Sequence, residues 1–127
     1  MTDHYYSNRP QAPHDERSFT FCLRGHNLRF FTDAGVFSRA RIDFGSVLLI
    51  ETMHIADKDQ VLDVGCGYGP IGLAAAKLAA NGWVTMIDIN ERAVALARRN
   101  AAHNKIENVE IIVSDLYAAV QNRQFDV

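Results

Sequence analysis

From Gln60 onward the sequence alternates short apolar runs with longer segments of helical character. Three short runs are rich in valine and isoleucine, as strands buried on both faces are: residues 60–64, 83–89 and 109–115. Two longer segments have the composition and spacing of helices: residues 70–80 and 91–104, the second with Asn90 as its expected N-cap. Because strands that alternate with crossover helices form parallel sheets, this order predicts an α/β fold, a Rossmann-like parallel sheet with flanking helices.

The residues before this pattern predict smaller elements. Residues 1–17 are polar, contain two prolines and are expected to form a loose N-terminal lead-in. Two β-prone runs within residues 18–31 predict a short β-hairpin. A helix is expected over residues 46–55, with Ser46 as its N-cap. We therefore expect a single domain over residues 18–127, preceded by the lead-in.

Composition excludes several classes of protein. No apolar run approaches the ~20 residues of a membrane-spanning helix, and the N-terminal residues MTDHYYSNRP predict no signal peptide. Cys22 and Cys66 lie far apart, and neither they nor the five histidines have metal-ligand spacing, which favours a cytoplasmic protein without a metal. The net charge of −2 gives no general nucleic-acid footprint. Between residues 17 and 41, however, five arginines accompany a single acid, which leaves open either a solvated edge or a phosphate-facing patch.

A glycine-rich loop, DVGCGYG at residues 63–69, joins the first strand of the sheet to its helix. Glycines at such a turn let the backbone bend sharply and let a ligand approach without meeting a Cβ. One acid ends each of the three strands: Asp63, Asp88 and Asp115. Because the carboxyl ends of parallel strands lie on one edge, we expect these acids to surround one ligand. Capping of the following helix is the alternative for each acid taken alone.

The glycine spacing admits two kinds of ligand. Gly67, Gly69 and Gly72 match the dinucleotide fingerprint, in which the loop faces a pyrophosphate. A carboxylate at Asp63 would repel that anion, whereas it would attract a cation. The charge of Asp63 therefore favours a ligand that carries a positive group at this end of the loop.

S-adenosylmethionine is a ligand of that kind, because it carries an ammonium, a sulfonium, a ribose and an adenine but no phosphate. Asp63 suits the ammonium group. Asp88 lies 19 residues past Gly69, close to the spacing of a ribose-binding acid, and a carboxylate can accept from both ribose hydroxyls. Asp115 suits the exocyclic amine of adenine, with Leu116 beside the flat base. The three acids thus predict S-adenosylmethionine as the cofactor.

At this point the sequence resembles a known family, the class I S-adenosylmethionine-dependent methyltransferases. The resemblance is greatest to the methyltransferase small domain branch, which includes ribosomal RNA small-subunit guanine-N2 methyltransferases. Four segments carry it: Pro70-Ile71-Gly72, Asp88-Ile89-Asn90, Gly35 to Ser38 and Asp43 to Leu49. By this resemblance the cofactor site is lined by Asp63, Gly65, Cys66, Gly67, Gly69, Asp88, Ile89, Asp115 and Leu116. Cys66 is expected to pack within the loop and not to act as a nucleophile.

The resemblance also suggests two residues on the substrate side and a departure from the family. Phe37 and Ser38 would lie near the cofactor or the target base, core packing being the alternative for Phe37. In the family, an Asn-Pro-Pro motif after the fourth strand receives the target amine. This sequence contains no Pro-Pro pair, and residues 125–127 read as a fourth strand that has just begun. We therefore assign no catalytic residue, and expect a cofactor-binding domain that is incomplete at its C-terminus and inactive alone.

The function implied by the resemblance is methylation of the exocyclic amine of a guanine in ribosomal RNA. The expected partner is ribosomal RNA, with no membrane involved, and sheet surface left uncovered would favour self-association. Two alternatives from other classes remain: a fragment of an NAD-dependent oxidoreductase and a non-catalytic cofactor-binding module. A protein or small-molecule substrate is a further alternative within the family.

Overall fold

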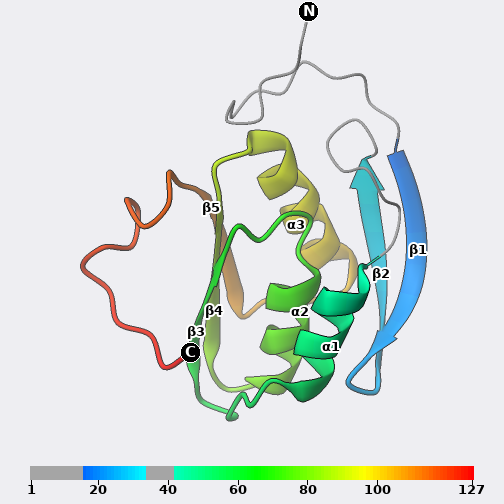
Figure 1. Cartoon of the computed structure of the whole chain (residues 1–127), viewed down its shortest axis with the longest axis horizontal. Coiled ribbons are helices and arrows are strands. Elements are labelled where there is room, and N and C mark those ends of the chain that lie inside the picture. The colour runs from blue at the N-terminus through cyan, green and yellow to red at the C-terminus, as the bar shows by residue number, and fades with distance from the viewer. Residues whose placement is uncertain (1–15, 34–41) are drawn as a thin grey trace, which may run out of the picture.

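The computed structural model describes residues 16–33 and 42–127. A β-hairpin, formed by β1 (Glu16–Leu23) and β2 (His26–Asp33), comes first and is followed by α1 (Phe44–Thr52). The remaining elements alternate: β3 (Gln60–Val64), α2 (Pro70–Leu78), β4 (Trp83–Asp88), α3 (Glu91–His103) and β5 (Val109–Val113). Figure 1 shows the three helices in a layer between the hairpin and the sheet. The expected α/β fold with a preceding hairpin is confirmed.

The sheet is parallel, with strand order β3-β4-β5. Val61, Val84 and Val109 lie side by side across it and set the register. Because the strand order follows the chain order, both crossover helices, α2 and α3, cover the same face. All three strands therefore end on one edge, as the sequence predicts.

The core between the sheet and these helices contains one very close contact, between α2 and β4. Met86 of β4 is fully buried, and a Cβ added to Gly72 of α2 would lie 2.7 Å from its side-chain atoms. Only a residue without a side chain allows this approach, so the last glycine of the fingerprint spacing serves packing between helix and strand. No helix in the described ranges is long and apolar enough to cross a membrane.

The start of α1 corrects one prediction. Asp43, not Ser46, is the N-cap: its carboxylate accepts from the Ser46 backbone N–H at 2.9 Å and from the Ser46 hydroxyl at 3.1 Å. The helix therefore begins at Phe44, and Ser46 lies inside its first turn as a donor. At the other end, Arg24 of the hairpin turn donates to the carbonyls of Ile50 and Met53, at 3.0 and 2.8 Å.

Residues 114–127 run along the side of the sheet opposite the helices, where Figure 1 draws them in orange and red. The Leu62 N–H donates to the Val127 carbonyl at 2.9 Å, and the Val127 N–H donates to the Gln60 carbonyl at 3.4 Å. This is the parallel bonding pattern, so Val127 lies along the free edge of β3, although residues 125–127, which were expected to begin a fourth strand, are not part of a strand in the structure. Arg123 of this segment pairs with Glu110 of β5.

Candidate functional site

The three predicted acids all lie at the edge where the parallel strands end. Asp63 is the last residue but one of β3, Asp88 is the last residue of β4, and Asp115 follows β5 by two residues. Asp63 and Asp88 are close enough that the charge of Asp88 helps to raise the pKa of Asp63. The parallel topology thus brings together acids that are more than 20 residues apart in the sequence.

The glycine loop is folded back onto β4 by its own backbone. Gly65, Gly67 and Gly69 have φ angles of +71°, +58° and +108°, a region that side chains disfavour. The N–H groups of Gly65 and Cys66 both donate to the Ile87 carbonyl, at 2.8 and 2.9 Å. These two bonds hold the first half of the loop against the end of β4.

The glycines of the loop face different surroundings. A Cβ added to Gly65 would meet nothing within 4 Å, so this side of the loop is open to a ligand. A Cβ added to Gly69 would lie 3.2 Å from side-chain atoms of Leu73 and Met86, so Gly69 faces the core. Gly65 is therefore the glycine that can lie against a bound molecule, while Gly69 starts α2 as its N-cap residue.

Asp63 has one carboxylate oxygen without a partner. Its Oδ2 atom is buried, and no hydrogen bond reaches it from the described residues. Burial raises the pKa of this carboxyl to about 6, opposed by a backbone hydrogen bond from Gly72 and assisted by the charge of Asp88. Because Asp63 accepts a hydrogen bond from the backbone N–H of Gly72 in the first turn of α2, it partly caps that helix, as the capping alternative expects. Capping leaves Oδ2 unexplained, because buried carboxylate oxygens normally have a donor.

Asp88 is held by two backbone N–H groups. Its Oδ2 atom accepts from Gly67 and its Oδ1 atom accepts from Asn90, both at 2.9 Å. Asn90 itself is the N-cap of α3, as predicted, and accepts from the N–H groups of Arg92 and Ala93. Each Asp88 oxygen keeps a second lone pair, so the carboxylate can accept two further hydrogen bonds.

The third acid lies in a turn after β5. Ser114 shapes this turn, since its hydroxyl donates to the Leu116 carbonyl at 2.9 Å and accepts from the Ala119 N–H at 3.1 Å. Leu116 has a φ of +51° and its side chain is 67% exposed. Asp115 is exposed as well, and Ile89, after β4, is half-buried. Both Asp115 and Leu116 are thus accessible at the site edge.

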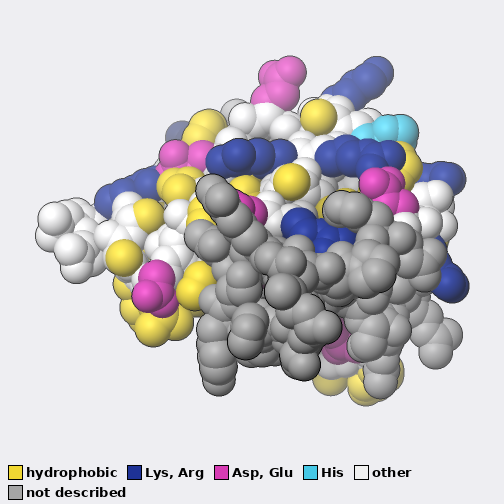
Figure 2. Space-filling model, turned by 90° about the horizontal axis from the view of Figure 1, so that it is seen from above, with side chains coloured by type: hydrophobic (Ala, Val, Ile, Leu, Met, Phe, Trp, Pro, Cys, Tyr) yellow, Lys and Arg dark blue, Asp and Glu magenta, His cyan; other side chains and the backbone are white. Residues whose placement is uncertain are grey.

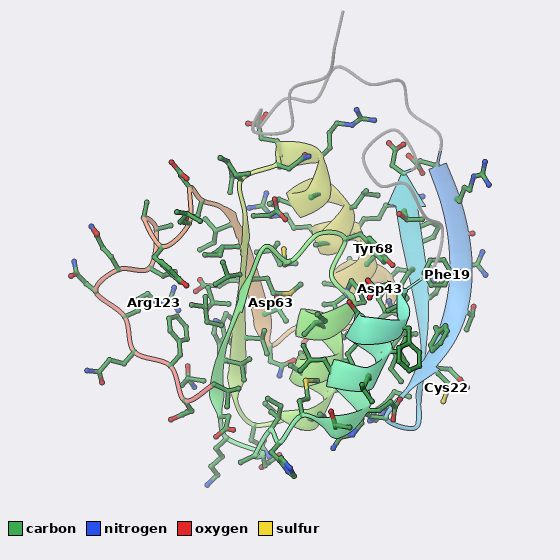
Figure 3. The ribbon with its side chains drawn as sticks, in the orientation of Figure 1. Phe19, Cys22, Asp43, Asp63, Tyr68 and Arg123 are labelled. Atoms are coloured by element: carbon green, nitrogen blue, oxygen red, sulfur yellow. The ribbon has the colours of Figure 1, made fainter. Side chains whose placement is uncertain are left out.

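Two residues inside the loop are buried. Burial, followed by the charges of Asp63 and Asp88, raises the pKa of the Cys66 thiol well above its usual range. A thiol that resists ionisation is a poor nucleophile, which agrees with a packing role. Tyr68 makes edge-to-face contacts with Phe19 and Phe30 of the hairpin, and burial, assisted by Asp43, raises its pKa to about 12. Figure 3 shows Phe19, Asp43 and Tyr68 on the hairpin side of the helices.

Sequence reasoning missed Asn100, which reaches the loop from α3. Its side-chain amide donates to the Tyr68 carbonyl at 2.8 Å, and the residue is fully buried. A signal was available, because Asn100 follows Ala93 and Ala97 at helical spacing and therefore lies on the buried stripe of α3. A polar side chain on an apolar stripe needs partners, and here the loop provides one.

The substrate-side candidates cannot be placed, since Phe37 and Ser38 lie outside the described residues. Of the arginines considered as a phosphate patch, Arg24 instead satisfies carbonyls at the end of α1. Figure 2 shows side chains of both charge signs mixed on the face that it displays. Within residues 16–33 and 42–127, no group of three His, Cys, Asp or Glu side chains could hold a metal ion.

Comparison with known proteins agrees with this geometry. The family model described as "Methyltransferase small domain" matches residues 27–127. The uncharacterized protein YbxB of Bacillus subtilis is 45% identical over 125 residues, which are 98% of this chain and 62% of YbxB. The ribosomal RNA small subunit methyltransferase C of Haemophilus influenzae is 38% identical over 127 residues, covering 97% of this chain and 38% of that protein.

A solved structure extends the likeness to three dimensions. The 16S rRNA N2 G1207 methyltransferase of T. thermophilus, in complex with AdoMet and guanosine, superposes with a TM-score of 0.79 at 26% identity. The match covers 90% of this chain and 32% of the Thermus chain. This chain therefore spans between about a third and two thirds of the length of these relatives. It belongs to the methyltransferase small domain family, whose members use S-adenosylmethionine.

Proposed function

We propose that this chain binds S-adenosylmethionine at the edge formed by Asp63, Asp88 and Asp115. The observation that carries the proposal is the buried Oδ2 atom of Asp63, which no described residue contacts by a hydrogen bond. A buried carboxylate oxygen without a donor is costly, and an ammonium group supplies both donors and the opposite charge. The α-ammonium of S-adenosylmethionine is a group of this kind.

The rest of the site fits the same molecule. The open side of Gly65 leaves room for the methionine portion beside the loop. The free lone pairs of Asp88 suit the two ribose hydroxyls. Asp115 and Leu116 are accessible for the exocyclic amine and the flat face of adenine, and the half-buried Ile89 directly follows Asp88 in the chain. NAD fits less well, because its pyrophosphate would meet the carboxylate of Asp63.

The proposed chemistry requires little of the protein beyond holding the cofactor in the correct orientation. The cofactor supplies a methyl group that its sulfonium already activates. The residues of this chain would orient it: Asp63 by the ammonium, Asp88 by the ribose, and Gly65 by allowing close approach. The Cys66 thiol would remain protonated and take no part. Positioning of this kind accounts for much of the rate in transfers to an already activated group.

As the substrate we propose a guanine amine in ribosomal RNA, with this chain as the cofactor-binding part of the enzyme. The Haemophilus and Thermus relatives are both named as ribosomal RNA methyltransferases, which supports this, as does the guanosine in the Thermus complex. Phe37 and Ser38 remain the candidates for the substrate side. The net charge of −2 means that RNA would be held locally and not by a general basic surface.

Calorimetric titration tests the proposal. We expect S-adenosylhomocysteine to bind and NAD not to bind under the same conditions. Transfer of labelled methyl groups to small ribosomal subunits or their RNA, measured with the intact gene product and not with this chain alone, then tests the substrate. Binding of NAD in preference to S-adenosylhomocysteine would overturn the cofactor assignment. Cofactor binding without transfer to any RNA, even by the intact gene product, would favour the non-catalytic module instead.

We also propose that the chain self-associates through apolar surface near the carboxyl ends of the sheet. Val64 and Val113, at the ends of β3 and β5, are 42% and 36% exposed, and Leu116 and Tyr117 are more exposed still. Apolar groups gathered in this way favour association. Light scattering across a range of concentrations checks this, and a constant monomer mass would contradict it.

A further inference from the structure

Asn100 joins three parts of the fold through a single side chain. Its Oδ1 atom accepts from the Phe31 N–H of β2 at 2.7 Å. Its Nδ2 atom donates to the Phe31 carbonyl at 3.0 Å and to the Tyr68 carbonyl of the glycine loop at 2.8 Å. The residue is fully buried within α3. One amide therefore links the helix, the hairpin and the loop.

The chemistry of these three bonds requires an asparagine. The side chain must accept one hydrogen bond and donate two, and a primary amide does both in a single plane. An aspartate of the same shape could not donate to both carbonyls, and an alanine would remove the hydrogen bonds to all three backbone groups. Each such loss costs about 1–3 kcal/mol in buried surroundings.

The bond to Tyr68 lies at a critical place in the loop. Gly67, the residue before it, is held through its N–H by Asp88, and Gly69, the residue after it, starts α2. The loop is thus fixed on the β4 side by Asp88 and on the α3 side by Asn100. Without Asn100 the Tyr68 carbonyl would lose this hydrogen bond, and the two flanking glycines offer little resistance to backbone rotation.

We propose that Asn100 is a positioning residue for the cofactor: it holds the glycine loop in the conformation that S-adenosylmethionine binds. Asn100 does not reach the acid edge itself, so it acts through the Tyr68 carbonyl. This inference rests on the proposed function, because it concerns the same loop. It adds that the affinity of the site depends on a side chain of α3 that also fastens β2.

The chain offers a matched control one helical turn further on. Asn104 accepts from the Arg29 N–H at 2.9 Å and donates to the Arg29 carbonyl at 2.7 Å, so it fastens the same strand two residues earlier. Its other bond, at 2.8 Å, goes to the carbonyl of Asn100 within the helix. Asn104 thus has the same chemistry as Asn100 but no contact with the loop.

The test compares Asn100→Asp with Asn104→Asp. Both variants weaken the link between α3 and the hairpin, so both are expected to lower the melting temperature. Only Asn100→Asp should weaken S-adenosylhomocysteine binding, by about tenfold or more, while Asn104→Asp changes it by about twofold at most. Calorimetry well below the melting temperature of each variant measures this. Equal losses of affinity in the two variants would overturn the inference.

A second measurement needs no substitution and covers the case in which Asn100→Asp fails to fold. Hydrogen exchange in the unsubstituted protein reports on the Phe31 amide, held by Asn100, and on the Arg29 amide, held by Asn104. Added S-adenosylhomocysteine should slow exchange at Phe31 several-fold more than at Arg29. Equal responses would overturn the inference. If the unsubstituted protein does not bind S-adenosylhomocysteine, the proposed function itself fails, which is a different result.

Discussion

The Asp88 carboxylate accepts a hydrogen bond of 2.9 Å from the backbone N–H of Gly67, so the acid that ends β4 holds the loop that follows β3. Asp63 stands in contrast to it. Its Oδ2 atom is buried and has no hydrogen-bond partner among the described residues. Two acids on one edge therefore differ in role: Asp88 shapes the loop, and Asp63 is left with capacity for a ligand.

The first prediction concerns the Asp63→Asn variant. Because the amide keeps the shape but removes the charge, the affinity for S-adenosylhomocysteine should fall by about tenfold or more. Methylthioadenosine, which has the adenosine and sulfur but no amino-acid portion, should bind the variant and the unsubstituted protein equally. Calorimetric titration of both ligands checks this. Equal losses for the two ligands would show that Asp63 supports the loop and does not contact the ammonium.

The second prediction is a pH dependence of cofactor affinity. The pKa of Asp63 is raised to about 6, first by burial, and the ammonium group binds only the ionised carboxylate. Affinity for S-adenosylhomocysteine should therefore be constant above pH 7 and fall by up to about tenfold per pH unit below pH 6. Titrations at pH 5, 6, 7 and 8 measure the profile. The Asp63→Asn variant serves as the control, and a profile of the same steepness there would exclude Asp63 as its origin.

The third prediction concerns the stability of the ligand-free protein. Since the pKa of Asp63 is higher in the folded state than the ordinary value of 3.8, the folded state binds its proton more tightly than the unfolded chain does. Stability from this group is present below about pH 4 and is lost as the pH rises to 6 and above. The Asp63→Asn variant should be more stable than the unsubstituted protein at pH 8, by on the order of 3 kcal/mol.

Urea denaturation at pH 4 and pH 8 measures this difference. At pH 4 the carboxyl is protonated in the folded state and about half protonated in the unfolded chain, so the difference between the free energies of unfolding of the two proteins should be small. A variant that is less stable at pH 8 would mean that the charge of Asp63 is compensated within the protein itself. In that case the carboxylate would not need a cationic ligand to balance its charge.

The elements that depend on local periodicity were predictable from the sequence. The first strand of the sheet, residues 60–64, and the Asn90 cap of α3 are confirmed as predicted. Each rests on residue types within one short window, where alternation and capping chemistry act directly. The cap of α1 was wrong, because Asp43 and Ser46 both suit a cap and only the backbone decides between them. Asp43 has the extended conformation that a cap requires.

The part of the site that joins distant segments was not predictable in the same way. The partners of Asn100 are 69 and 32 residues away in the sequence, so no local pattern connects them. The acids were found because the parallel topology assigns every strand end to one edge, a rule that acts over any separation. No such rule says which polar residue of a helix meets which carbonyl.

The last prediction concerns packing beneath the loop. In the Gly72→Ala variant the added Cβ would lie 2.7 Å from the Cγ, Sδ and Cε atoms of Met86, which is fully buried. The variant should therefore lose about 1–3 kcal/mol of stability, because a packed core yields little space. Gly45→Ala in α1 is the matched control: its Cβ would be 3.4 Å from the nearest atom, an ordinary contact. That variant should be neutral or slightly stabilised, by no more than about 0.5 kcal/mol.

Shortening the opposing side chain distinguishes overpacking from a backbone effect at position 72. Met86→Ala removes the Cγ, Sδ and Cε atoms that the new Cβ would meet, so adding it to Gly72→Ala should recover part of the lost stability even though Met86→Ala alone is destabilising. A double-mutant cycle by urea denaturation measures this coupling, which should be on the order of 1 kcal/mol in favour of the double variant. Simple additivity of the two losses would mean that the glycine is needed for its backbone and not for the approach of α2 to β4.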